Sequence, residues 1–427
     1  MRQRKWIGYV VCLIALLASA DWLVAQGGPG GQKVLRGRPP QGERRLLYVP
    51  SSGTGGGRVQ NGSGILVFDV RDKFRFVKRI PTWDYGAWED PDGDEVKGME
   101  VSPETGRLYL ATFTGLAAFD LITEKLIWEQ TYGGNCCDRL SLSPDSKTLY
   151  VPELGPIREK GTDGWLVVDA MTGKTITKID TPQSRGAHNT IVSPDGSKVF
   201  MGGLNGAYVS VADPKTNKVV QTVGPFSAPP GNLGYPPNSK PSVRPFTING
   251  SGTLVFATLN GLLGFEVGDV KTGKVLHRVE VPNRPWTRDQ VKTEGTGSHG
   301  IAMTPDEKEL WVTDTINGAL QVFDATVMPP KWVKEVRMTR RTKPTDSRGD
   351  ALDYPDWVTI GLDGKYVYAS TGDVVDAASK QVVASLVDEF GRNMRSQKLV
   401  EVLWRSGKPV RASDQWGYGQ VTARPTN

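Results

Sequence analysis

Short apolar runs separated by turn signals recur along most of the chain. The stretch from Ser298 to Met338 contains four of them, Gly300–Met303, Leu310–Thr313, Ala319–Phe323 and Val333–Val336. Each run has the length of a strand and is rich in β-branched or aromatic residues, and Thr-Pro-Asp and Asn-Gly indicate reversals between runs. Four such strands in a unit of about fifty residues are typical of one blade of a β-propeller.

The unit repeats at regular intervals. An aspartate closes the third run of each copy, and successive aspartates are 44 to 56 residues apart: Asp69, Asp120, Asp169, Asp213, Asp269, Asp324 and Asp376. One blade cannot bury both of its faces alone, so the copies must stack in a ring. The pattern predicts an all-β fold, a seven-bladed β-propeller of four-stranded antiparallel blades over residues 45–405.

The first copy lacks its innermost strand, because Leu46–Pro50, Gly64–Val70 and Phe74–Ile80 match only the second, third and fourth runs. A spare run, Lys398–Trp404, follows the last complete copy. Its pairing with blade one would close the ring and remove free sheet edges. We expect residues 21–44 to form a flexible Gly- and Pro-rich linker and residues 406–427 to form a C-terminal tail.

The N-terminus has the features of a targeting segment. Arg2, Arg4 and Lys5 precede the apolar run Ile7–Ala18, which is followed by small residues suited to cleavage. This run is shorter than the ~20 residues that span a bilayer, which argues against an uncleaved anchor. We predict a signal peptide over residues 1–20, with a second cleavage point as late as residue 26. The protein would then be periplasmic or secreted, without a transmembrane span, and we expect a monomer.

Charge and composition narrow the classes of partner. The formal net charge of +6 at pH 7 falls to +3 if residues 1–20 are removed, so we expect no nucleic acid partner. The 50 glycines fit many short strands and tight turns. The acidic loop from Thr82 to Val96 does not have EF-hand spacing, and we interpret it as a solvated turn rather than a calcium site.

The cysteines do not indicate a metal site. Once Cys12 leaves with the signal peptide, only the adjacent Cys136 and Cys137 remain. They are either two thiols or a vicinal disulfide. Two neighbouring residues supply too few ligands for a metal, so we expect none there. The sequence leaves any cofactor unknown.

Strand direction predicts where a site would lie. Residues that lead into each innermost strand and residues that end each second strand should surround the same mouth of the ring. The lead-in residues are Lys97, Asp138-Arg139, His188-Asn189, Arg244, Ser298-His299 and Asp356-Trp357, and acidic residues end two second strands. Charged and imidazole side chains at such positions point to binding or catalysis. The candidate ligand-binding residues are Arg139, Glu153, His188, Arg244, His299 and Asp314.

An alternative explanation applies to the histidines. His188 and His299 can each hydrogen-bond the backbone of a neighbouring blade and hold the ring together. No Gly-x-Ser-x-Gly, His-Glu-x-x-His or phosphate-loop motif accompanies them. The sequence therefore leaves open whether these residues form a site or a structural staple.

Local motifs resemble the YVTN-type bacterial β-propellers, within a wider group similar to the quinoprotein amine dehydrogenase propeller subunit. The resemblance covers Leu46 to Trp404 and depends on LWVTD (310–314), LYVPE (149–153), SPDG (193–196) and the turn at Asp169–Lys174. It implies the fold, but propellers host many functions.

Three functions follow as hypotheses. The first is an exported binding or scaffold module whose channel rim binds a small polar or anionic ligand or a periplasmic partner protein. The second is a hydrolase similar to the seven-bladed lactonases, with a His, Arg and acid constellation at the same rim. The third is an accessory propeller of a redox enzyme, although the chain lacks a Cys-x-x-Cys-His haem motif.

Overall fold

The computed structural model describes residues 42–51, 63–82, 96–132, 136–153, 164–184, 186–227, 242–282, 297–339 and 354–421. The predicted signal peptide, nearly all of the predicted linker, the acidic loop 83–95 and residues 422–427 lie outside the described residues. Residues 228–241 and 340–353 also lie outside the described residues.

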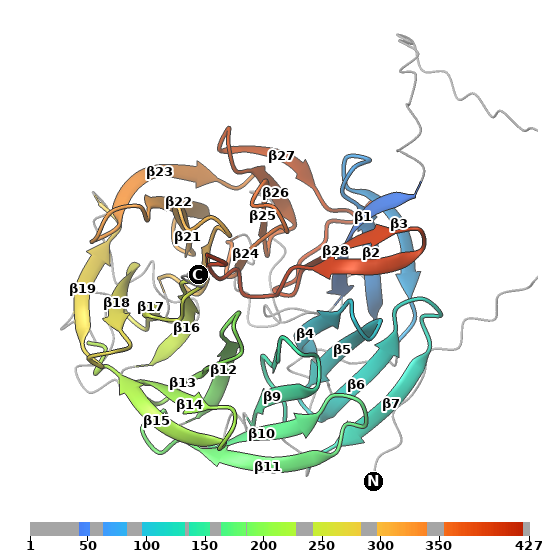
Figure 1. Cartoon of the computed structure of the whole chain (residues 1–427). Helices are drawn as coiled ribbons and strands as arrows, with labels where there is room; N and C mark the ends of the chain where they lie inside the picture. Colours follow the sequence, from blue (N-terminus) through green and yellow to red (C-terminus); the bar gives the residue numbers. More distant parts are fainter. Residues whose placement is uncertain are drawn as a thin grey trace, which may run out of the picture.

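Seven antiparallel sheets are arranged around a central axis, which confirms the predicted seven-bladed propeller (Figure 1). Blades two to four contain β4 (Val96–Ser102), β5 (Arg107–Thr112), β6 (Gly115–Asp120), β7 (Leu126–Thr131); β8 (Ser141–Leu142), β9 (Thr148–Pro152), β10 (Gly164–Asp169), β11 (Thr175–Asp180); and β12 (Ala187–Val192), β13 (Val199–Gly203), β14 (Val209–Asp213), β15 (Lys218–Val223).

Blades five to seven repeat the same order from the axis outwards. They contain β16 (Val243–Ile248), β17 (Leu254–Leu259), β18 (Gly264–Asp269), β19 (Val275–Glu280); β20 (Ile301–Met303), β21 (Glu309–Asp314), β22 (Ala319–Asp324), β23 (Lys331–Arg337); and β24 (Val358–Ile360), β25 (Tyr366–Ala369), β26 (Asp373–Asp376), β27 (Gln381–Ser385). Side chains on the two faces of each sheet pack against neighbouring blades, where they form the buried apolar clusters of the core.

Blade one joins the two ends of the propeller. Its order is β29 (Lys408–Ala412), β28 (Val400–Arg405), β1 (Glu43–Ser51), β2 (Gly64–Asp69) and β3 (Arg75–Ile80). Strand β28 pairs antiparallel with β1, so the predicted closure by Lys398–Trp404 is confirmed. Strand β29 adds a further strand, formed by residues that the sequence placed in the C-terminal tail.

A buried ion pair fastens this closure to blade seven. The Arg45 guanidinium on β1 contacts the fully buried Glu401 carboxylate on β28 and donates hydrogen bonds of 2.6 and 2.7 Å to Asp363. Glu401 also accepts a hydrogen bond of 2.9 Å from the Tyr368 hydroxyl. The two ends of the chain and blade seven are therefore held by one polar cluster.

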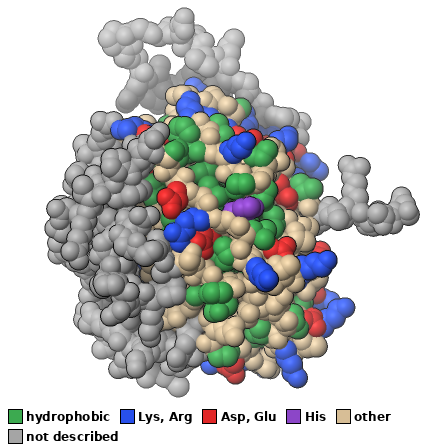
Figure 2. All heavy atoms as spheres, turned by 90° about the vertical axis from the view of Figure 1, so that its left-hand side faces the viewer, with side chains coloured by type: hydrophobic (Ala, Val, Ile, Leu, Met, Phe, Trp, Pro, Cys, Tyr) green, Lys and Arg blue, Asp and Glu red, His purple; other side chains and the backbone are tan. Residues whose placement is uncertain are grey.

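The outermost strand of every blade contains a one-residue bulge at the same register position. The extra residue is always aliphatic: Val77, Ile127, Ile176, Val220, Leu276, Val333 and Val383. Six of these side chains are between 41% and 65% exposed, so they face solvent rather than the core. Figure 2 shows part of this outer wall, where apolar side chains alternate with charged and polar ones. A bulge interrupts the row of backbone groups that an edge strand offers to another chain.

After β29 the chain enters the channel. We call residues Ser413–Val421 the plug, because they lie against the innermost strands of several blades. Backbone groups of Gly417 accept from Thr247 Oγ1 and from Met303 N, each at 2.8 Å, and Gly419 N donates to Ile248 O at 2.9 Å. Gly417 has φ +65°, and a Cβ there would lie 2.7 Å from the Ala302 side chain. The plug therefore needs glycine at its closest approach to the ring.

Candidate functional site

Residues that lead into the innermost strands meet at one end of the channel, which we call the mouth. Every blade contributes at least one of them: Lys398, Lys97, Asp138-Arg139, His188, Arg244, His299 and Asp356, in order from blade one to blade seven. We call this set the mouth cluster. Apart from Arg244, which is partly buried, each is less than a tenth exposed. Charged groups so deeply buried must find partners, and these are found across blade boundaries.

One chain of hydrogen bonds crosses the mouth. His188 on β12 contacts the Asp138 carboxylate through Nδ1, and its Nε2 lies 3.2 Å from Arg139 Nη1. Arg139 in turn donates to Gln397 Oε1, and Gln397 Nε2 donates to Asp356 Oδ2 at 2.8 Å. Blades three, four, one and seven are thus linked by side chains alone.

Asp356 connects this series of hydrogen bonds to blade six. Its carboxylate accepts from the Ser370 hydroxyl and lies 3.0 Å from Arg395 Nη2. Its backbone carbonyl lies 2.9 Å from His299 Nδ1. Because a carbonyl can only accept, His299 Nδ1 must carry the proton.

Trp357 lies between the mouth cluster and the plug. The Arg139 guanidinium and the Lys398 ammonium lie 4.3 and 5.2 Å from the centre of the Trp357 ring, within the range of cation–π attraction. The Trp416 ring of the plug lies 5.6 Å away, and Trp357 Nε1 donates to the carbonyl of Gln415 at 3.0 Å. The plug therefore forms the floor of the mouth.

Burial and neighbouring charges set the protonation of the Asp138–His188 pair. Burial lowers the pKa of His188 to about 3, against the opposing effect of Asp138. Burial alone would raise the pKa of Asp138, but His188, Lys97 and Arg139 together hold it well below its usual range. We infer a neutral imidazole that donates from Nδ1 to an ionised carboxylate. Its Nε2 lone pair then accepts from Arg139, so His188 is fully used within the network.

His299 differs from His188 in one respect. Burial and the charges of Arg244 and Arg139 lower its pKa well below the usual value, so this imidazole is also neutral. Since Nδ1 donates to the Asp356 carbonyl, Nε2 carries the lone pair. His299 is thus the mouth histidine whose unprotonated ring nitrogen is suited to accept a hydrogen bond from a ligand, whereas its lowered pKa disfavours protonation.

The sequence before Arg139 fixes this residue at the mouth. Cys136 and Cys137 form a disulfide, which is one of the two states predicted. Cys137 N donates to Thr112 O of blade two at 3.0 Å, and Asp138 N donates to Pro152 O at 3.1 Å. These bonds anchor the lead-in segment of blade three to blade two and to its own second strand, β9, and position the Asp138 and Arg139 side chains.

Of the six predicted site residues, Arg139, His188, Arg244 and His299 come together. Arg244 acts electrostatically on both histidines, and Arg139 contacts His188 directly. The carboxylates of Glu153 and Asp314 have local partners instead. Glu153 forms an ion pair of 2.5 Å with Lys178 on the outer strand β11.

Asp314 is used locally. Its carboxylate accepts from the backbone of Ile316 and Asn317 and from the side chains of Asn317 and Gln321. These bonds order the hairpin between β21 and β22. The carboxylates of the two acidic residues at the ends of second strands therefore interact with partners in their own blades.

Sequence reasoning missed the contribution of the closing strand. Arg395, Gln397 and Lys398 lead into β28 as the other cluster residues lead into their strands. The lead-in positions of the complete repeats do not include these residues. The equivalent positions at and before the spare run Lys398–Trp404 are the sequence signal that identifies them.

Within the described part of the chain, no group of three or more His, Cys, Asp or Glu side chains is arranged to hold a metal ion. The same residues contain no helix with the length and apolarity needed to cross a membrane.

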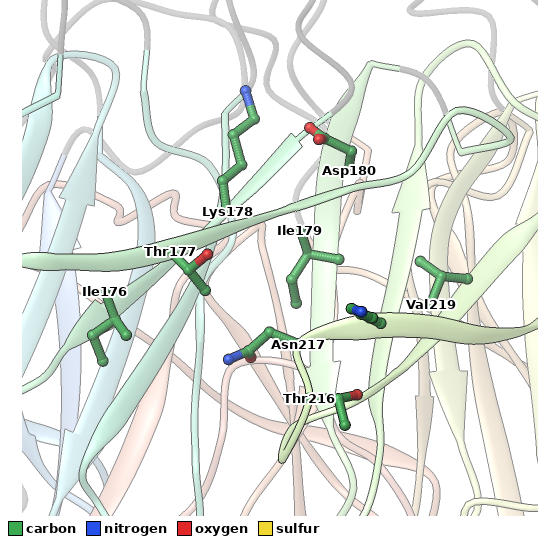
Figure 3. A pocket seen from close by; sticks show the side chains of 9 residues that line it. Ile176, Thr177, Lys178, Ile179, Asp180, Thr216, Asn217 and Val219 are labelled. Atoms are coloured by element: carbon green, nitrogen blue, oxygen red, sulfur yellow. The ribbon is translucent and has the colours of Figure 1, made fainter.

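An open groove of about 560 Å³ lies on the outer wall, between β11 and the turn that leads into β15 (Figure 3). It is lined by Ile176, Thr177, Lys178, Ile179, Asp180, Thr216, Asn217, Lys218 and Val219. These are side chains of two neighbouring outer edges, and Lys178 is already paired with Glu153. Its polar side chains belong to the exposed outer edge, unlike the buried charged groups of the mouth.

Comparison with known proteins supports the fold. No protein-family profile matches the chain, and no curated protein matches its sequence. Among solved structures, the chain is similar to hydrazine synthase from Kuenenia stuttgartiensis, with 16% sequence identity and a TM-score of 0.53. The match covers 78% of this chain and 93% of that one. Identity at this level shows a shared fold alone.

Proposed function

We propose that this chain is an exported β-propeller binding module that holds a small anionic ligand at the mouth of its channel. The observation that carries this proposal is the convergence of lead-in residues from all seven blades on one end of the axis. Five of the residues gathered there are cationic: Lys97, Arg139, Arg244, Arg395 and Lys398. Packing between blades of alternating apolar strands has no need of such a set.

The environment strengthens an interaction with an anion. The cationic groups are largely removed from water, where electrostatic attraction is stronger than at the surface. Guanidinium groups suit carboxylate and phosphate oxygens, and the neutral His299 adds an acceptor for a ligand hydroxyl. Trp357 supplies an apolar wall beside them. A small, partly apolar anion fits this chemistry better than a bare ion.

The test is calorimetric titration of the purified mature chain with succinate and with inorganic phosphate. We expect saturable binding of at least one probe with a Kd below about 1 mM. Arg244→Gln should weaken it about tenfold or more, the usual effect of losing a charged hydrogen bond. Arg337→Gln, the same change on the outer strand β23, is the matched control. No binding of either probe, or equal binding by Arg244→Gln and the parent, would refute the proposal.

A hydrolase similar to the lactonases is a second candidate, favoured by the neutral His299 with its Nε2 lone pair directed away from the Asp356 bond. A lactone-hydrolysis assay with and without divalent metal separates the two functions. Turnover that His299→Gln abolishes would favour the enzyme, whereas binding without turnover favours the module.

We propose export and membership of the YVTN-type group on the sequence features alone. The mature N-terminus should lie between Asp21 and Gly27, as N-terminal sequencing of the natively expressed protein can determine. Recovery of intact Met1 or Arg2 from the membrane fraction would contradict export. The likeness to hydrazine synthase concerns the fold, and we do not extend that enzyme's activity to this chain.

A further inference from the structure

The plug is held in the channel mainly through backbone groups and amides. Ser413 N donates to Glu401 O of blade one at 2.8 Å, and Gln415 Nε2 donates to Leu140 O of blade three at 2.9 Å. Gln415 Oε1 accepts from Met99 N of blade two at 3.3 Å. Farther along, Gln420 N donates to Pro305 O of blade six at 3.2 Å. Several blades therefore grip the plug through groups whose hydrogen bonding does not depend on pH.

Two carboxyl groups are buried together near the first residues of the plug. Asp414 belongs to the plug, and Glu100 belongs to β4, the innermost strand of blade two. Their exposed fractions are 8% and 6%. Asp414 Oδ1 accepts hydrogen bonds from the backbone of Trp416 and Gly417 at 2.7 and 2.6 Å. Glu100 interacts with Gln415 and is repelled by the charge of Asp414.

Among the described residues, the titratable groups on the plug, β4 and β28 do not neutralise this pair. Tyr418 of the plug can only add negative charge, and burial followed by the charges of Asp414 and Glu100 raises its pKa well above the usual value. Glu401 on β28 is paired with Arg45. Glu307 accepts from Val421 N at the far end of the plug, at 3.1 Å. Lys97 lies on β4 three positions before Glu100, at the mouth, where it acts on Asp138.

We propose that the plug is a pH-sensitive stopper, seated in the channel while Glu100 and Asp414 are protonated and loosened when both become ionised. Two like charges in a site shielded from water repel each other strongly, whereas both are solvated once the plug leaves. Burial raises the pKa of Asp414 to about 6 and that of Glu100 well above its usual value. The seated state therefore binds protons more tightly than the open state, and rising pH favours opening.

Opening would remove the floor of the mouth. Trp416 packs on Trp357, whose ring also contacts the Arg139 guanidinium. Departure of the plug would expose Trp357 to the channel on the opposite face of the propeller. The proposed pH response of the plug does not depend on the proposed ligand, because both carboxyl groups and the groups that hold the plug belong to the protein itself.

Hydrogen–deuterium exchange of the full mature chain, without any added ligand, tests this proposal. Protection of the peptide covering residues 413–421, corrected for intrinsic exchange rates, should fall by about tenfold or more between about pH 5 and about pH 8. A peptide from β16 should show no such change. Asp414→Asn keeps the acceptor oxygen that Trp416 and Gly417 use, and this variant should retain the protection at the higher pH.

Glu100→Gln is the second variant and should act in the same direction, which keeps the test decisive if Asp414→Asn does not fold. Glu104→Gln, on the exposed turn of the same blade, is the matched control and should behave as the parent. The proposal is overturned if protection of 413–421 does not depend on pH, or if both carboxamide variants lose protection as the parent does. Failure to bind succinate or phosphate would leave this result unaffected.

Discussion

The two halves of the channel are filled in different ways. At the mouth, buried polar and charged side chains from all seven blades converge, and hydrogen bonds that run from His188 through Arg139 to Asp356 link four of those blades. In the other half, a single segment of main chain, Ser413–Val421, occupies the axis and bonds to the blades through backbone groups and amides. The innermost strands thus surround an ionic network at one end of the channel and, at the other end, the plug, which is held mainly by uncharged groups.

This difference gives the two halves opposite responses to protons. In the mouth, burial among cations depresses the pKa of His188 and His299, so low pH opposes the folded network. In the plugged half, burial raises the pKa of Glu100 and Asp414, so high pH opposes the folded arrangement. One physical cause, the removal of charge from water, acts in opposite directions because one half buries bases and the other buries acids.

The largest effect should come from removing both the plug and the closing strand. Deletion of everything after Asn393 eliminates β28 and β29 and the Glu401 carboxylate that binds Arg45. We expect loss of a cooperative melting transition, because the ring is then open and two sheet edges are exposed. Calorimetry of the truncated chain checks this expectation. A transition within a degree or two of the intact protein would show that the closure contributes little.

Breaking only the buried ion pair should have a smaller effect. Glu401→Gln leaves Arg45, whose side chain is 13% exposed, without a counterion from β28. Disruption of a buried pair costs about 3–5 kcal/mol of the free energy of unfolding, less here because Asp363 still binds Arg45. Denaturant unfolding measures the change. Asp363→Asn, at a half-exposed position, is the control and should cost less.

The two mouth histidines should differ in their contribution to stability. His188→Ala removes a partner from both Asp138 and Arg139, and we expect a loss of about 1–3 kcal/mol in the free energy of unfolding. His299→Ala removes one bond to a backbone carbonyl and should cost about 1 kcal/mol. If the histidines serve only a ligand site, both variants would melt like the parent while losing anion binding. Equal and large losses would favour the staple alone.

The effects of pH on stability should have opposite signs in the two halves of the channel. The pKa of His188 in the fold, about 3, lies below its ordinary value of 6.5, so its contribution is complete above pH 6.5 and declines as pH falls towards 3. The pKa of Asp414 in the fold, about 6, lies above its ordinary value of 3.8, so stability declines as pH rises from 3.8 to about 6.

Melting temperatures between about pH 4 and pH 7.5 distinguish these contributions. The advantage of the parent over His188→Gln should shrink as pH falls. Asp414→Asn should gain over the parent as pH rises, by about 1–3 kcal/mol at the upper end. Parallel pH curves for all three proteins would show that the two halves of the channel do not differ in this way.

The repeat architecture could be predicted because each blade carries the same sequence pattern. The aspartate after each third strand and the spare run Lys398–Trp404 specified seven blades and their closure, and both are confirmed. The lead-in rule also brought Arg139, His188, Arg244 and His299 to the same mouth, because propeller geometry places equivalent positions around one axis.

Other features could not be read from the repeats. Glu153 and Asp314 occupy equivalent positions as well, but Lys178 and the turn at Asn317 bind their carboxylates locally. The plug has no periodic signal, since its place depends on contacts with strands hundreds of residues away. For Cys136 and Cys137, neighbouring positions permitted both thiols and a disulfide, and only the three-dimensional structure distinguishes them.

The bulge in each outer strand has a consequence for how copies of this protein can meet. A propeller presents one unpaired strand per blade around its circumference, and flat edges of this kind template fibrils in crowded compartments. Here the bulge breaks the run of free amides in every outer strand, and in six blades an exposed aliphatic residue such as Ile176 or Val220 projects from it at the same register position. Association of two copies through their outer strands is thereby hindered. Contacts with other molecules are left to the two flat faces of the propeller.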